Sequence, residues 1–100
     1  MILTVQSCGH TSYRLGISLS DSKSIFLSQR HISVRLKIQT QIIETKTTCG
    51  PPLPKGFDLY SSEISKWIIH NKFHEYPKGK PTKLNFFYAK KEQHVLTFIV

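Results

Sequence analysis

The chain has 100 residues, of which 39% are hydrophobic and 20% are charged, proportions that suit a globular protein. Fourteen lysines and arginines against six acids give a formal net charge of +8, which excludes an acidic mimic of DNA. No stretch approaches the roughly 20 apolar residues of a membrane-spanning helix, and the first residues lack the basic region of a signal peptide.

Short strands dominate the first half of the chain. We predict one strand over Ile2–Gln6 and another over Tyr13–Ser20, where odd-numbered residues are apolar and even-numbered ones are polar or glycine. This period of two is typical of a strand with one buried face. Asp21–Lys23 is predicted to turn the chain, and Ile25–Ser28 to form a further short strand.

The longest alternating pattern is HISVRLKIQTQIIETK, residues 31–46. Even-numbered residues from Ile32 to Ile42 are predicted to lie on one covered face, with their odd-numbered neighbours on a solvated face. A typical strand has about five or six residues. We therefore expect a bend, a bulge or a long hairpin arm within this segment.

The prolines and glycines of CGPPLPKGF, residues 49–57, exclude both a helix and a central strand, so this segment is predicted to be a short linker. The period then changes to that of a helix, with one face formed by Tyr60, Ile64, Trp67 and Ile68. The expected N-cap is Asp58, Ser61 or Ser62. Pro77 with Gly79 is expected to end the helix.

The last two predicted strands, residues 84–90 and 94–100, flank Lys91–Gln93 as a hairpin and are apolar on both faces. Such strands are typical of a sheet that is covered on both sides. The predicted order is β-β-β-β-α-β-β in a single domain, residues 1–100. We expect an α+β fold, with an antiparallel or mixed sheet of about five to six strands and one main helix packed on it. The alternative is a small, partly open β-barrel with one helix.

The densest basic segment lies at the predicted helix end and in the following loop, where residues 66–91 hold seven lysines and one acid, Glu75. Lysines supply the salt-sensitive part of nucleic-acid affinity, and exposed aromatic rings stack on single-stranded bases. The alternative is a solvated surface whose cations offset the helix dipole. The predicted nucleic-acid-binding residues are Lys66, His70, Lys72, Tyr76, Lys78, Lys80 and Lys83, with a second patch of Arg35 and Lys37 beside Arg14 if their strands are neighbours.

Two histidines also fall on this segment. His70 and His74 are four residues apart on the predicted helix, so they could share a metal ion with help from Cys8 and His10. The pattern lacks the glutamate of the HExxH motif and a matched second pair, and we therefore predict no metal site. In a metal-free ribonuclease, either histidine would act as acid or base while Lys80 held the phosphate.

The segment QIIETK places Glu44 and Lys46 on one face at the end of an apolar strand, with Asp21 upstream. This arrangement locally resembles the PD-(D/E)xK nucleases. The resemblance implies that Asp21 and Glu44 hold a divalent metal such as Mg²⁺ beside the phosphate, while Lys46 stabilises charge or helps to activate water. The sequence departs from that family because no proline precedes Asp21 and strands replace the leading helix. The alternative is an ordinary exposed Glu–Lys pair.

Three classes of function remain. A nucleic-acid-binding module for DNA or RNA is favoured by the net charge and by the clustering of lysines near aromatic residues. A protein-binding inhibitor or assembly module that docks on an acidic partner is the first alternative, and a small nuclease is the second. We expect a binding protein rather than an enzyme, with no cofactor unless the nuclease hypothesis brings Mg²⁺.

Further expectations concern environment and assembly. We expect a cytoplasmic protein without a membrane span, in which Cys8 and Cys49 are free thiols; two cysteines are also compatible with a disulfide in a secreted protein. The strand at Ile2–Gln6 is a candidate sheet edge, and pairing with a second copy there would form a homodimer.

Overall fold

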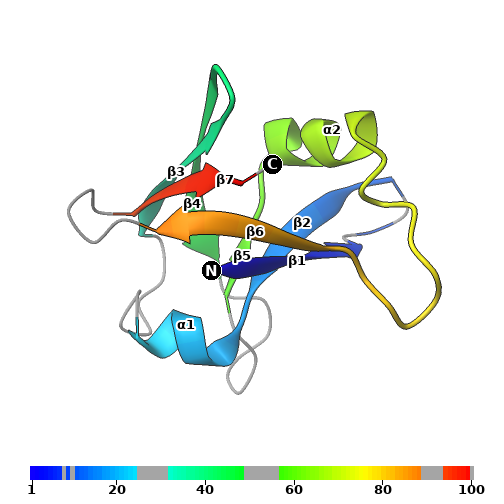
Figure 1. Ribbon diagram of the computed structural model, residues 1–100, viewed down its shortest axis with the longest axis horizontal. Helices are drawn as coiled ribbons and strands as arrows, with labels where there is room; N and C mark the ends of the chain where they lie inside the picture. Colours follow the sequence, from blue (N-terminus) through cyan, green and yellow to red (C-terminus); the bar gives the residue numbers. More distant parts are fainter. Residues whose placement is uncertain (8, 10, 25–31, 49–56, 89–93, 100) are drawn as a thin grey trace.

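The computed structural model describes residues 1–7, 9, 11–24, 32–48, 57–88 and 94–99 (Figure 1). Within them, seven strands close into a barrel in the order β1-β2-β5-β4-β3-β7-β6, accompanied by two helices. The barrel alternative therefore describes the architecture, although the barrel is closed rather than partly open. The elements are β1 (Ile2–Ser7), β2 (Tyr13–Ile17), α1 (Leu19–Ser24), β3 (Ser33–Ile38), β4 (Gln41–Thr48), β5 (Asp58–Leu59), α2 (Ser62–His70), β6 (Lys83–Tyr88) and β7 (Val95–Phe98).

β1 is paired on both of its sides. It runs antiparallel to β2 from Leu3 to Ser7 and antiparallel to β6 from Ile2 to Thr4. The free edge expected at Ile2–Gln6, which would have allowed pairing with a second copy, is therefore occupied within the chain. This follows from closure, because a barrel pairs the strands that would otherwise lie at the ends of a sheet.

The long alternating segment is a hairpin of β3 and β4 rather than one strand. Its turn consists of Gln39, which has a φ of 54°, and Thr40, and it leaves Ile38 opposite Gln41. Cross-strand partners point to the same face of a sheet, so this two-residue turn moves the buried positions from even numbers in β3 to odd numbers in β4. Ile42, which was predicted to be covered, is consequently 55% exposed.

A short helix, α1, stands where the sequence predicted a strand end and a turn. The Ser18 Oγ accepts a hydrogen bond from the Asp21 backbone N–H (3.1 Å), as an N-terminal cap does, and Asp21 adds an acid to the first turn. The turn predicted at Asp21–Lys23 is therefore wrong. The buried Ser22 Oγ accepts a hydrogen bond from the Phe57 N–H (2.9 Å), which ties α1 to the residue before β5.

Several predicted features lie outside the described residues. They are the strand at Ile25–Ser28, the linker at residues 49–57 except for its last residue, the turn at Lys91–Gln93, and both cysteines, Cys8 and Cys49.

α2 begins as predicted but ends early. The Ser61 Oγ accepts a hydrogen bond from the Ile64 N–H (3.1 Å), so Ser61 is the N-cap among the three candidates. The helix ends at His70, and Lys72 follows with a φ of 59°. A residue in this left-handed conformation interrupts the helical ladder. The predicted stop at Pro77 is therefore wrong, because the chain has already left the helix.

The core combines one face of the barrel strands with one face of α2. Ile64 and Ile68 of α2 are fully buried. Phe86 of β6 is also fully buried, and its ring centroid lies 6.4 Å from that of Trp67 and 5.4 Å from that of Phe98. These aromatic contacts join α2 to β6 and β7.

β6 and β7 bury one face each. Leu84 and Phe86 point inward, whereas Phe87 is 59% exposed, and Ile99, just after β7, is 52% exposed. The expectation that both faces of these strands are covered is therefore wrong. Alternate residues of a barrel strand point outward, and no other described element covers Phe87.

Phe86→Ala and Phe87→Ala test this inward and outward assignment at neighbouring positions. Phe86→Ala should lower the free energy of unfolding by about 3–5 kcal/mol, because it empties a site enclosed by other rings. Phe87→Ala should change it by no more than about 0.5 kcal/mol. Urea unfolding followed by Trp67 fluorescence measures both, and equal losses would contradict the barrel assignment.

Candidate nucleic-acid interface

Most of the predicted basic residues lie along α2 and the connection from α2 to β6. All of them are exposed, and we call them the α2–β6 basic surface: Lys66, His70, Lys72, Lys78, Lys80 and Lys83. Lys66 and His70 are one helical turn apart on α2, and Lys83 is the first residue of β6. The connection passes around the side of the barrel (Figure 1). The basic residues therefore follow one another in the sequence along α2, the connection and the start of β6.

Backbone hydrogen bonds hold the connection in place. The Glu75 N–H donates to the Lys72 carbonyl (3.1 Å), and the Lys80 N–H donates to the Pro77 carbonyl (2.9 Å). Gly79, with a φ of 80°, occupies the left-handed position of the second turn. The connection is thus shaped by its backbone, which leaves the lysine side chains free to contact solvent or a ligand.

The electrostatic balance of this surface is positive. Within the part of the chain that the structure describes, none of its five lysines forms an ion pair. The acids nearest in sequence are Glu63 on α2 and Glu75 in the connection, both exposed, and Asp21 of α1 lines a depression with Lys83. Cations that are neither paired nor buried can contact phosphates without first breaking an internal interaction.

The aromatic residues of the connection support the barrel instead of facing solvent. Phe73 and Tyr76 are half-buried and pack against the core. The ring of His74 lies 5.2 Å from that of Tyr13, between centroids. Tyr76, predicted to stack on bases, thus exposes only part of its ring. Among the described aromatic residues, Phe87 on β6 is the most exposed at 59%, followed by Tyr60 at 42%, although Phe87 was predicted to lie in a strand covered on both faces.

The second predicted patch is divided by the barrel. Arg14 lies on β2, and β5 and β4 separate that strand from β3, which carries Arg35 and Lys37. Arg14 Nε lies 3.2 Å from Gln6 Oε1 and 3.4 Å from a carboxylate oxygen of Asp58. Its side chain therefore links β2 to the neighbouring strands β1 and β5. Arg35 and Lys37 remain near one another on the outer face of β3.

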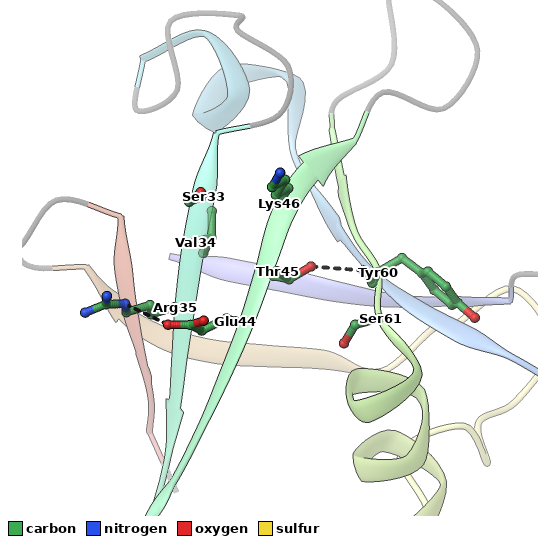
Figure 2. A pocket seen from close by; sticks show the side chains of 8 residues that line it. All are labelled: Ser33, Val34, Arg35, Glu44, Thr45, Lys46, Tyr60 and Ser61. Atoms are coloured by element: carbon green, nitrogen blue, oxygen red, sulfur yellow. Dashed lines mark hydrogen bonds and ion pairs between the residues drawn. The ribbon is translucent and has the colours of Figure 1, made fainter.

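The structure places the nuclease candidates in two different depressions. Figure 2 shows Glu44 and Lys46 on β4, in a depression of about 590 Å³, where Glu44 pairs with Arg35 at 3.3 Å. Asp21 lies on α1 and lines a separate depression of about 570 Å³ with Lys83. The three residues of the proposed nuclease pattern are therefore not gathered in one pocket.

The histidine pair is also separated by the early end of α2. His70 is on the helix, whereas His74 lies beyond Lys72 and against Tyr13. Their helical spacing, on which a shared metal or an acid–base pair depended, is therefore absent. The described residues contain no group of three His, Cys, Asp or Glu side chains that could hold a metal ion, and His10 lies outside them with Cys8.

No family model, curated protein or solved structure matches this chain. No helix in the described ranges has the length and apolarity needed to cross a membrane. The chemistry of the molecular surface is therefore the basis for assigning a function.

The ion pairs Arg14–Asp58 and Arg35–Glu44 should contribute unequally to stability. Asp58→Ala should lower the free energy of unfolding by about 1–3 kcal/mol, because it leaves the partly buried Arg14 without its carboxylate. Glu44→Ala breaks an exposed pair and should cost less than about 1 kcal/mol. Thermal and urea unfolding would show the difference, and a larger loss for Glu44→Ala would contradict the structural role given to Arg14.

Proposed function

We propose that this protein binds DNA or RNA through the α2–β6 basic surface. The observation that carries the proposal is the series of exposed cations from Lys66 to Lys83, in which no lysine forms an ion pair with another described residue. A chain of phosphates could follow this series and release its counterions, which is the main source of sequence-independent affinity. The net charge of +8 would draw such a ligand toward the protein.

The geometry favours a single strand over a duplex. Lys83, Asn85 and Phe87 are exposed at alternate positions along β6, so the series continues from a cation to an amide and then to an open aromatic ring. Stacking of a base on such a ring requires an unpaired strand. Phe87→Ala should therefore weaken binding of a single strand more than that of a duplex.

Replacing Lys78, Lys80 and Lys83 together with Gln tests this series directly. If each lysine contacts one phosphate, the slope of log affinity against log salt should become shallower by about two for a single strand, at roughly 0.7 per contact. Fluorescence polarisation of labelled single-stranded DNA and RNA, titrated across salt concentrations, measures this slope.

A matched control removes the same charge from another surface. Arg35, Lys37 and Lys46 lie on β3 and β4, and replacing all three with Gln should leave the slope nearly unchanged. Equal losses in the two triple variants would show that net charge alone causes binding. That result would overturn the assignment to the α2–β6 basic surface.

A further inference from the structure

Among the described residues, β4 has a complete strand partner on one side only. β3 pairs with it from Gln41 to Lys46, whereas β5 reaches it only at Thr47 and Thr48. Figure 2 shows β4 and α2 diverging below the contact between Thr45 and Tyr60. The barrel therefore contains an open stretch of strand edge, although its strands form a closed cycle.

The ladder defines which backbone groups face this opening. The Thr47 N–H donates to the Ile32 carbonyl, so odd-numbered residues of β4 direct their N–H and C=O groups toward β3. The even-numbered Ile42 and Glu44 direct theirs to the opposite side. Among the described residues, none pairs with these groups. The backbone N–H and C=O groups of Ile42 and Glu44 thus have no partner among the described residues, and they are spaced as in a strand that can pair with another strand.

A side-chain hydrogen bond lies where β5 stops pairing with β4. The register that pairs Thr47 with Leu59 would next place Lys46 opposite Tyr60. The Tyr60 carbonyl instead accepts a hydrogen bond from the Thr45 Oγ1 (2.9 Å), and the chain turns into α2 at its N-cap, Ser61. The helix then packs against β2, where the Tyr13 N–H donates to the Ser65 Oγ.

The space between β4 and α2 is a groove formed by three consecutive depressions. The first contains Glu44 and is the depression drawn in Figure 2, the second contains Glu44 and Glu63, and the third contains Glu63. The third has a volume of about 310 Å³ and lies beside the ring of Trp67. We call this space the β4–α2 groove, and its main lining residues are Ile42, Glu44, Glu63, Lys66, Trp67 and His70.

We propose that the β4–α2 groove binds an extended, acidic segment of a partner protein, which adds a strand to β4. The segment would pair with the open backbone groups of Ile42 and Glu44, while alternate side chains pointed into the groove. An apolar side chain would fit the depression beside Trp67. This mode of binding gives affinity through the main chain and selectivity through the side-chain positions.

Charge favours an acidic segment. Lys66 and His70 line the helix side of the groove, and Lys46 lines its far end. Of the two acids in the groove, Glu44 is already paired with Arg35. The donors and acceptors of β4 alternate as those of another strand do, whereas a nucleic-acid backbone presents phosphate acceptors and no matching donors. The open edge therefore points to a peptide. The inference stands on the β4 backbone and not on the nucleic-acid function proposed above, although Lys66 and His70 belong to both surfaces.

Glu44→Pro tests the proposal with little disturbance of the barrel. The substitution removes an N–H that points into the groove and that no ladder bond uses, a position where an edge strand tolerates proline. Glu44→Ala is the matched control, because it removes the same carboxylate and keeps the N–H. Circular dichroism and thermal unfolding would establish that both variants fold.

The probe is a synthetic peptide of about eight residues in which Glu alternates with Val, a length that spans one strand. We expect the peptide to bind the wild-type protein, and to bind Glu44→Pro at least about tenfold more weakly than Glu44→Ala, because the two variants lack the same carboxylate and differ in the backbone N–H. A twin peptide methylated on alternate backbone nitrogens should also bind about tenfold more weakly. Equal affinity for both variants, or no binding to the wild type, would overturn the proposal.

Hydrogen exchange provides a second test that needs no variant. In the free protein the amides of Ile42 and Glu44 should exchange quickly, and those of Ile43 and Thr45 slowly, because only the latter pair with β3. Adding the peptide should slow exchange at Ile42 and Glu44. Slow exchange at these two amides before any peptide is added would show that this edge of β4 is already paired. No change after binding would show that the peptide does not pair with it.

Discussion

The barrel depends on β5, a strand of only two residues. Asp58 and Leu59 pair with β2 on one side and with β4 on the other, and without them the sheet would end at both of those strands. The Asp58 carboxylate also lies 3.4 Å from Arg14 Nε on β2, so a largely buried charge pair reinforces the shortest strand. Because β5 is so short, α2 must begin beside the sheet and complete the core there with Ile64 and Ile68.

The local parts of this fold were predictable from the sequence. The strand predicted over Tyr13–Ser20 is present as Tyr13–Ile17, and one of the three predicted caps, Ser61, caps α2; both predictions depended on neighbouring residues. The turn between β3 and β4 was missed because alternation continues through Gln39 and Thr40 although the buried parity changes. A sequence pattern shows which residues are apolar. It does not show where a hairpin turn changes which positions, even or odd, face the core.

The candidate sites show the same division. Exposure of the lysines was predictable, since such side chains are rarely buried. The exposure of Phe87 was not, because its neighbours in sequence are apolar and only the closed barrel turns it outward. The open edge at Ile42 and Glu44 has no local signature at all. β5 stops at Leu59, and the next residue, Tyr60, accepts a hydrogen bond from the side chain of Thr45, 15 positions earlier.

The pairing of β1 with β6 bears on the order in which the molecule can be assembled. β1 and β2 are close in sequence, so their hairpin can form while the chain is still short. The other side of β1 needs β6, which is synthesised near the end of these 100 residues. Until β6 is made, β1 has unpaired backbone groups along one edge. Incomplete chains can associate through such an edge. This topology therefore leaves one edge of β1 open to association with other chains until β6 has been made.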